Sequence, residues 1–483
     1  MLYLLSILIP LVTGALLPFL KIDKTAKRVT YVMGTLVLTA LSAAGGMLSG
    51  KPFTFAAFGE GLDLTLFSDG IGCFFAVLVL TAWILVSIYT FRYITHEGND
   101  NRFFAFLLLT LGGLLGVCFA KNLVTLYLFF ELATLASMPM VLHAQSKESI
   151  AAALKYLFYS VGGAFLGLLG LFAIYFYSPS HDFVLGGTVD AASLGDNKNL
   201  FFVMVFLAVV GFATKAGMFP MHNWLPTAHP VAPASASALL SGIITKAGVI
   251  AVIRVIYYSV GTELLAGSWV QYAWIALALV TVFMGSMMAY HEKVLKKRLA
   301  YSTVSNLSYI LVGLFTLCPQ GLLGALLHVV AHASAKTALF LVAGSIIFET
   351  HKTRVDELRG IGKEMPVTMW CFTLASLSLI GIPPLSGFVS KWHLAGAALE
   401  SVPGFVGVLI PVVLLISALL TAGYLLSVVV EGFFPGKDYD YTTPHTEAKA
   451  VMVVPVVCLT AITLCAGIFA QPLTGVISSL LGL

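Results

Sequence analysis

Residues 211–233 read GFATKAGMFPMHNWLPTAHPVAP, so Lys215 is followed by Gly217 and a series of prolines within an otherwise apolar segment. Proline inside a helix removes a backbone hydrogen bond and kinks the helix. Residues 378–394, SLIGIPPLSGFVSKWHL, repeat this pattern ahead of Lys391. Non-helical backbone at membrane depth is tolerated where it is buried in protein or lines a wet cavity. Both stretches are therefore expected to be broken membrane helices.

The composition supports a membrane environment along the whole chain. Of the 483 residues, 59% are hydrophobic and only 10% are charged, whereas soluble proteins carry about 25% charged residues. A chain this apolar cannot cover a water-facing surface, so lipid is expected to be its solvent. The net charge of +4 is modest, and without a large basic region a nucleic-acid partner is not expected.

A helix that crosses a bilayer needs about 20 mainly apolar residues, and this rule predicts about fourteen spans. The apolar N-terminus has no basic region before it, so we interpret it as a retained first span and not a signal peptide. The remaining polar stretches leave no room for a nucleotide-binding fold or a catalytic head. The expected spans are 2–20, 29–48, 69–91, 103–119, 122–142, 151–177, 199–219, 234–258, 270–290, 299–316, 321–348, 366–393, 405–430 and 450–471.

The distribution of basic residues predicts the orientation of these spans. Inner loops of membrane proteins carry an excess of lysine and arginine. If both termini are non-cytoplasmic, 18 of the 26 basic residues fall in inner loops and three in outer loops. This bias favours an even number of spans. The two broken helices are then spans seven and twelve, and their odd separation means that they point in opposite directions, as in inverted-repeat transporters.

Five basic residues and one acid remain inside the spans. A charge at the centre of a membrane helix costs at least ~2.5–3.5 kcal/mol, so such residues usually face a partner or a water-filled path. For Arg254, near a span end, a structural ion pair or contact with the interface is the favoured interpretation, because arginine stays protonated. A buried lysine or glutamate can instead alternate between charged and neutral forms as neighbouring charges move. The six residues are Glu131, Lys215, Lys246, Arg254, Lys336 and Lys391.

His328, His332 and Lys336 are spaced four residues apart. On a helix these positions share one face and form a line of titratable groups about 12 Å long. A zinc site and a purely packed histidine pair are the alternatives. No carboxylate lies nearby in the sequence and Lys336 would repel a cation, so a proton wire is favoured. The six cysteines show no closely spaced pair, and no iron–sulfur cluster, zinc or other cofactor is expected.

Five motifs together carry a family resemblance. They resemble the antiporter-like subunits, which include the D-type subunit of Mrp cation/proton antiporters and the large membrane-arm subunits of complex I and of membrane-bound hydrogenases. The resemblance extends over roughly spans three to thirteen. The motifs are LFFELATLASMP (128–139), TKAGMFPMHNWLPTAHPVAPASASALLSGIITKAG (214–248), KRLAYSTVSNLSYI (297–310), HVVAHASAKTALFL (328–341) and GIPPLSGFVSKWHL (381–394).

The resemblance implies a fold and a set of roles. The fold is an all-α polytopic membrane protein, a single transmembrane domain over residues 1–483 with about fourteen helices. It contains two inverted five-helix repeats, residues 103–258 and 270–430, with discontinuous helices seven and twelve. Within it, Glu131 would pair with Lys215 and Lys246 would be the central relay. The row would continue through His328, His332 and Lys336 to a terminal site at Lys391.

The expected function is that of a proton-translocating membrane subunit in a multi-subunit ion-pumping complex. The driver would be either a redox reaction or Mrp-type cation exchange, with no redox chemistry in this chain itself. Expected partners are other membrane subunits, with a second antiporter-like subunit and a soluble redox arm among the candidates, in the cell (inner) membrane. A stand-alone secondary transporter and a structural subunit without its own channel are the alternatives. Protons fit better than Na⁺, because lysine and histidine are poor Na⁺ ligands.

Overall fold

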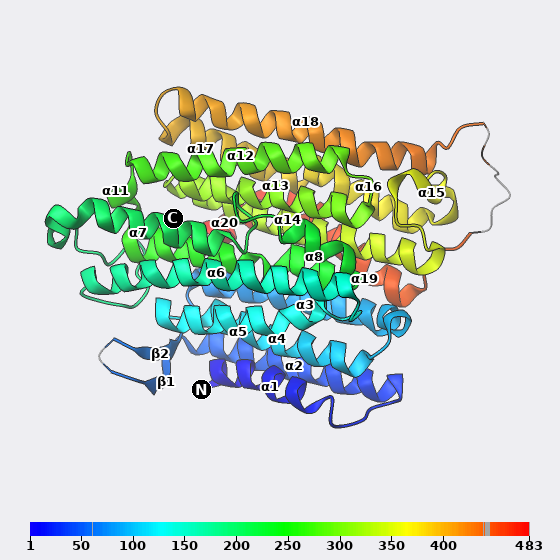
Figure 1. Ribbon diagram of the computed structural model, residues 1–483, viewed down its shortest axis with the longest axis horizontal. Coiled ribbons are helices and arrows are strands. Elements are labelled where there is room, and N and C mark those ends of the chain that lie inside the picture. Colours follow the sequence, from blue (N-terminus) through cyan, green and yellow to red (C-terminus); the bar gives the residue numbers. More distant parts are fainter. Residues whose placement is uncertain (60, 438, 440–444, 483) are drawn as a thin grey trace.

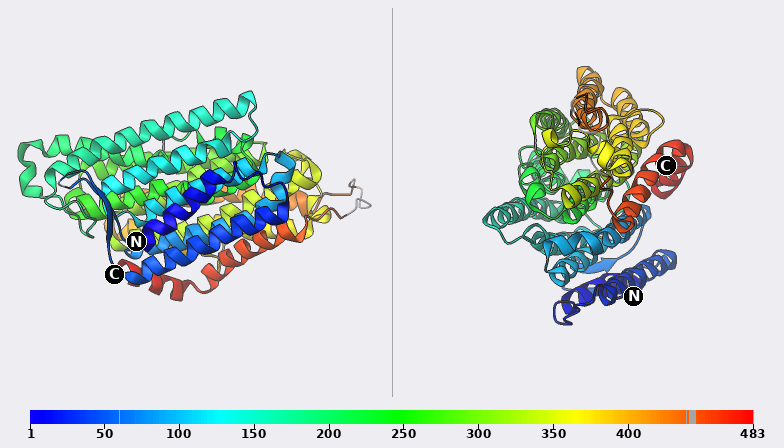
Figure 2. Two further views of the ribbon diagram at one scale, coloured as in Figure 1. Left: turned by 90° about the horizontal axis from the view of Figure 1, so that it is seen from below. Right: turned by 90° about the vertical axis from the view of Figure 1, so that its right-hand side faces the viewer.

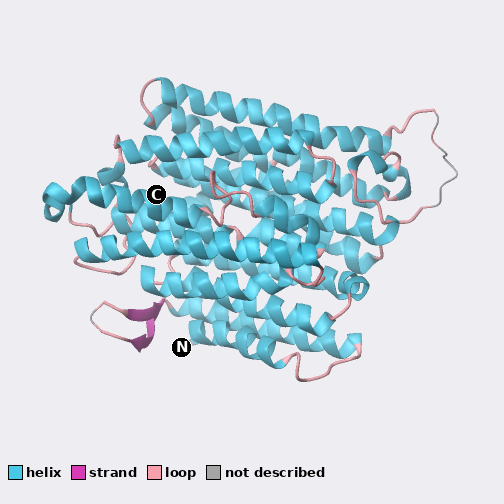
Figure 3. Ribbon diagram, in the orientation of Figure 1, coloured by secondary structure: helices cyan, strands magenta, loops and turns pink. Residues whose placement is uncertain are grey.

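The computed structural model describes residues 1–59, 61–437, 439 and 445–482, and long helices run side by side along its longest dimension (Figure 1). Both termini lie toward the same end of the bundle (Figures 1 and 2). Helices make up most of the described fold, as Figure 3 shows. The long continuous helices are α1 (Leu2–Leu16), α2 (Thr25–Ser49), α3 (Gly70–Glu97), α4 (Asp100–Phe119), α5 (Leu123–Val141), α6 (Lys147–Tyr177), α12 (Trp269–His291), α13 (Leu295–Phe315), α14 (Pro319–Thr350), α18 (Phe405–Phe433) and α19 (Ala450–Ile468).

Eleven helices in the described residues are long and apolar enough to cross a membrane. The expected count of about fourteen is therefore not confirmed, although each expected span coincides with helical structure. Three expected spans are not among the eleven. The helix α1 has only 15 residues, α13 is rich in serine and begins with three basic residues within its first turn, and the expected twelfth span is divided into two short helices.

Both proline-rich stretches interrupt helical structure, as the proline patterns predict, and the first break lies near the end of the expected span 199–219. The first break runs from α7 (Lys198–Ala213) through irregular backbone to α8 (Leu225–Val231), and the second from α16 (Pro366–Ile380) to α17 (Ser386–Ser401). Gly217 and Gly381 adopt φ angles of +73° and +93° within these breaks, a region that favours glycine. At the first break the Trp224 indole donates to Thr214 O at 2.9 Å, which satisfies one freed carbonyl.

The expected eighth span is one continuous rod with changes of helical pitch. It comprises α9 (Ala234–Leu239), the π-helical segment η2 (Leu240–Ile244), α10 (Lys246–Ile253) and the π-helical segment η3 (Arg254–Val260). A Cβ atom at Gly242 would lie only 2.0 Å from Thr337 Oγ1 on α14. Glycine therefore allows this rod to pack unusually close to α14.

Two elements are additions to the predicted fold. A hairpin of β1 (Phe53–Ala57) and β2 (Asp63–Leu66) joins α2 to α3 and pairs in antiparallel register. The expected last span ends early, and a separate helix α20 (Ala470–Leu481) packs against α3 and α14. The remaining short helices are η1 (Ala191–Asn197), α11 (Thr262–Leu265), η4 (Val355–Glu357) and α15 (Ile361–Glu364).

Arg254 forms the structural ion pair that was the favoured interpretation of this residue. Its guanidinium binds both oxygens of Asp69, at 2.5 and 2.7 Å, and lies 4.7 Å from the rings of both Phe183 and Tyr258. Asp69 also caps α3 by accepting from the Gly72 N–H at 2.9 Å. The pair therefore fastens the eighth span to the start of α3.

Removing one partner of this pair is expected to destabilise the protein. Asp69→Asn leaves the buried guanidinium without its counter-charge, which costs about 3 kcal/mol or more. The apparent melting temperature of the purified protein should fall by several degrees. Asp182→Asn is the matched control, because Asp182 forms an exposed ion pair with Lys121 that contributes about 1 kcal/mol at most. Equal shifts in the two variants would contradict the assignment.

Candidate functional site

The centre of the candidate site is the face of α14 that carries His328, His332 and Lys336. All three side chains are fully buried, with 0% exposure. The two imidazole rings lie 6.4 Å apart between centroids. Nδ1 of His332 lies 2.6 Å from Nζ of Lys246, and Nδ1 of His328 lies 2.8 Å from Oγ of Ser390. The predicted line on one helix face is therefore present and is in contact with residues of two other spans.

The contact between Lys246 and His332 suits proton exchange. An ammonium can donate only to an unprotonated ring nitrogen, so this pair shares a proton that either partner can hold. The Lys246 ammonium also donates to Ser241 O at 2.8 Å. Lys336 donates to Leu299 O at 3.0 Å and lies close enough for its charge to repel that of Lys246. The charge on Lys246 therefore depends on the charges of His332 and Lys336.

The two inward-facing Nδ1 atoms do not converge on a common point. One faces a lysine and the other faces a serine. In the described part of the chain no group of three or more His, Cys, Asp or Glu side chains could hold a metal ion. The chemistry of the donors around His328 and His332 thus favours proton transfer over metal binding.

Lys391 lies just over one turn into α17 and reaches back across the second break. Its ammonium donates to Leu379 O at 2.7 Å and to Ile380 O at 2.9 Å. These are the last carbonyls of α16, where the helix dipole places partial negative charge. Nζ also lies 4.9 Å from the ring centroid of Tyr309. The break therefore creates the cation site that Lys391 occupies.

Lys215 lies at the first break and is only 1% exposed. Its ammonium donates to the hydroxyl of Thr134 on α5 and lies 5.0 Å from the ring of Phe130 and 5.4 Å from that of Tyr156. Glu131, three residues before Thr134 on α5, is partly exposed and attracts the Lys215 ammonium. The two charges are within electrostatic range, but no N–O separation of 4 Å or less joins them.

The row is not a continuous chain of hydrogen bonds, and one of its gaps lies between Lys215 and Lys246. Among the described residues no hydrogen bond joins these two side chains, although their helices are in contact. A Cβ atom at Gly248 would lie 2.6 Å from Phe212 O and 3.0 Å from Lys215 Cβ. Close packing at this glycine brings the two helices together while the two ammonium groups stay separate.

Two buried titratable residues lie beside the row and were missed by the sequence analysis. Lys296, which was assigned to an inner loop, is a buried residue of α13 that donates to Ala232 O at 2.5 Å. His229 is 0% exposed, stacks on Phe340 at 4.6 Å, and has no hydrogen-bond partner at either ring nitrogen. It interacts electrostatically with both Lys296 and Lys336. The feature of the sequence that could have identified His229 is its position within the proline-rich stretch 211–233.

The helices that carry these residues follow one another across the bundle. From the α1 and α2 side toward α18, the row passes from α5 to α14 and then α17 (Figure 1). The row therefore crosses the helices from side to side. A transferred charge would move roughly in the plane of the membrane for most of this distance.

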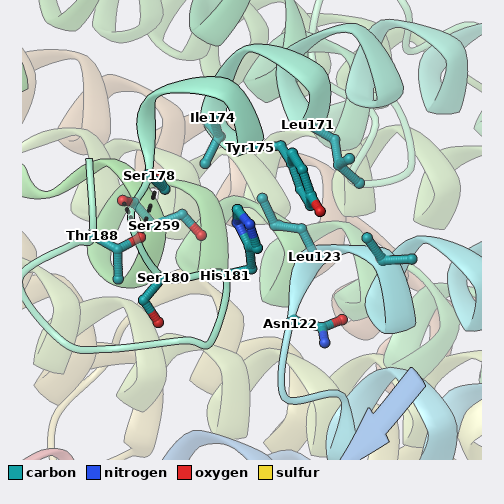
Figure 4. A pocket seen from close by; sticks show the side chains of 11 residues that line it. Asn122, Leu123, Leu171, Ile174, Tyr175, Ser178, Ser180, His181, Thr188 and Ser259 are labelled. Atoms are coloured by element: carbon teal, nitrogen blue, oxygen red, sulfur yellow. Dashed lines mark hydrogen bonds between the residues drawn. The ribbon is translucent and has the colours of Figure 1, made fainter. Parts of the chain in front are cut away.

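A separate polar pocket lies between the end of α6 and the loop that follows it (Figure 4). Its volume of about 20 Å³ is room for one water. His181 stacks on Tyr175 at 3.8 Å within its lining, beside Ser178 and Thr188. No residue of the charged row lines it. This pocket is therefore separate from the candidate site.

Known proteins share both the sequence pattern and the fold. Residues 120–433 match the family described as NADH:quinone oxidoreductase/Mrp antiporter, TM. NADH-quinone oxidoreductase subunit N of Desulforudis audaxviator is 32% identical over 91% of this chain and 89% of its own length. The D-type subunit of the Na⁺/H⁺ antiporter of Alkalihalophilus pseudofirmus is 27% identical over 98% and 94% of the two chains.

A solved structure confirms the fold. A chain of the membrane-bound sulfane sulfur reductase, an archaeal respiratory membrane complex, superimposes with a TM-score of 0.85 at 21% identity and covers 99% of this chain and 96% of its own. The family match spans well over half of the sequence and includes every residue of the predicted row. This protein is a multi-pass membrane protein and belongs to the NADH:quinone oxidoreductase/Mrp antiporter transmembrane family.

Proposed function

We propose that this chain is a proton-translocating subunit of a multi-subunit ion-pumping membrane complex. The series of contacts from Lys246 through His332 and His328 to the Ser390–Lys391 segment carries the proposal, because each group in it can hold or pass a proton. The named relatives are themselves subunits of larger assemblies, an NADH-quinone oxidoreductase and a Na⁺/H⁺ antiporter. The driver would be either a redox reaction of partner subunits or Mrp-type cation exchange.

The mechanism follows from the electrostatics of neighbouring sites. Because Lys246 and Lys336 repel each other, a proton arriving at one favours release from the other. His332 and His328 then relay charge toward the carbonyl-lined site of Lys391. At the other end, the charge of Glu131 stabilises a proton held by Lys215, whose ammonium donates to Thr134. A change in the charge of one group thus changes the proton affinity of the next group along the row.

We infer that His229 and Lys296 form a branch from Lys336 toward the end of the bundle opposite the termini. Lys296 interacts electrostatically with Glu97 at the end of α3, and Glu97 accepts from the Tyr93 hydroxyl at 3.0 Å. Glu97 is partly exposed, so it can exchange protons with water. This branch gives the lateral row a connection to one membrane face.

The basic residues support the orientation proposed for the chain. With both termini non-cytoplasmic, the branch opens toward the cytoplasmic side of the cell membrane, where the basic loops are concentrated. The two broken helices support two inverted repeats, 103–258 and 270–430, with one lysine site at each break. Each repeat then contributes one half of the row.

Lys246→Ala is expected to reduce proton translocation about tenfold or more, since it removes the central proton-holding group. The measurement is quenching of a pH-sensitive dye in sealed membrane vesicles that contain the whole complex. Native electrophoresis checks that the complex still assembles. Lys51→Ala, at an exposed lysine, is the control. Wild-type translocation in an assembled Lys246→Ala complex would contradict the central role.

Glu131→Ala and Lys215→Ala are each expected to reduce translocation, because each removes one charge of a coupled pair. The double variant should be no worse than the more severe single variant, since residues that act as a unit are not additive. Glu263→Gln, at an exposed acid, serves as the control. The pairing is wrong if both single variants translocate protons at the wild-type rate.

Lys296→Ala is expected to slow translocation about three- to tenfold without abolishing it, since a branch to water limits supply while the row stays intact. His229→Leu should give a similar reduction. Lys293→Ala is a closely matched control, because Lys293 lies only three residues before Lys296 and is exposed. Equal rates in the Lys296 and Lys293 variants would exclude the branch.

A further inference from the structure

Tyr309 on α13 is a buried residue that contacts two groups of the row at once. Its ring stacks on the His328 imidazole at 5.4 Å between centroids, with 17° between the planes. The Lys391 ammonium lies 4.9 Å from the same ring centroid. Its hydroxyl points elsewhere and donates to Leu414 O on α18 at 2.7 Å. The ring and the hydroxyl of Tyr309 therefore have different partners.

The ring lies where a counter-charge would be expected. No carboxylate among the described residues lies within 4 Å of the Lys391 ammonium. Its polar partners are the carbonyls of Leu379 and Ile380. The negative face of an aromatic ring attracts a cation, and the attraction is strongest where water is excluded. Tyr309 and the end of α16 together supply the negative potential at this site.

The first broken helix shows what differs. There Lys215 contacts Thr134, which follows Glu131 by three residues, whereas Tyr309 follows Asn306 by the same interval. Asn306 is a neutral amide and its Oδ1 has no partner in the structure. The second lysine therefore has two backbone carbonyls and one ring as partners, whereas the first has a hydroxyl, two rings and the attraction of Glu131.

We propose that Tyr309 is a positioning residue for proton transfer between His328 and Lys391. Its ring holds the ammonium against the end of α16 and fixes the plane of the imidazole. His328 is thereby kept in contact with Ser390, the residue that precedes Lys391. This inference rests on the proposed function, and it assigns the effect to the aromatic face and not to the hydroxyl.

The test separates the ring from the hydroxyl within the intact complex. Tyr309→Phe keeps the ring and should translocate protons within twofold of wild type, whereas Tyr309→Leu should lose at least fivefold. Tyr257→Leu is the matched control, because Tyr257 is also buried and donates to a backbone carbonyl, Leu314 O at 2.9 Å, with no lysine on its ring. Translocation is measured with a pH-sensitive dye in sealed vesicles, at equal amounts of assembled complex.

A second series changes the ring electrostatics with little change in shape. Phenylalanine with one, two or three fluorine atoms at position 309 should give a stepwise fall in translocation, because fluorine weakens the negative face of the ring. This series remains informative if Tyr309→Leu does not assemble. Equal rates across the series, or a loss in Tyr309→Phe as large as in Tyr309→Leu, would overturn the inference.

The outcomes also distinguish this inference from the proposed function. If Lys246→Ala stops translocation while the fluorinated series matches wild type, the row stands and the role of Tyr309 is wrong. If Lys246→Ala has no effect, the proposed function itself fails. A stepwise fall in the fluorinated series together with loss in Lys246→Ala supports both.

Discussion

Lysine ammonium groups inside a hydrocarbon layer require partners within the protein, and most features of this fold provide such partners. Lys246 contacts His332 because Gly242 allows the eighth span to pack closely on α14. Lys336 finds a carbonyl of α13. Each partner is neutral, so none holds the proton permanently. The same contacts that make burial tolerable would leave the lysines free to exchange protons in the proposed function.

The two broken helices provide partners for their lysines in different ways. At the second break the helix ends and its last carbonyls face Lys391, so the backbone itself supplies negative potential. At the first break the freed carbonyl of Thr214 is taken by Trp224, and Lys215 depends on α5 instead. The Lys391 site therefore depends on the end of α16 and the ring of Tyr309, and the Lys215 site responds to the partly exposed acid Glu131.

Arg254 shows how a permanent charge is handled in the same span as a titratable one. Its bidentate pair with Asp69 and its two aromatic neighbours neutralise it locally. This pair lies two helical turns from Lys246 and fixes one end of the eighth span against α3. A fixed ion pair in this position would keep the helix in place while Lys246 changes charge in the proposed mechanism.

Several features were predictable because they depend on neighbours along the chain. Proline and glycine near Lys215 and Lys391 predicted both breaks, and the spacing of His328, His332 and Lys336 predicted a shared helix face. Other features depend on packing between distant segments. Lys296 was expected in a loop because the tenth span was expected to begin at residue 299, yet α13 begins at Leu295 and buries it. The hairpin β1–β2 and helix α20 were missed because both are too short to cross a membrane and lie outside the long apolar segments.

The sequence by itself determined that this protein lies in a membrane. It also determined the positions at which two helices break and the charged residues that lie within the membrane spans. Composition and local periodicity carry that information. Only the tertiary structure decided which charges meet. It joined Lys246 to His332 and left Glu131 apart from Lys215, and it placed Tyr309 between His328 and Lys391. Such contacts are set by how closely whole helices approach one another, and that distance depends on side chains far apart in the sequence.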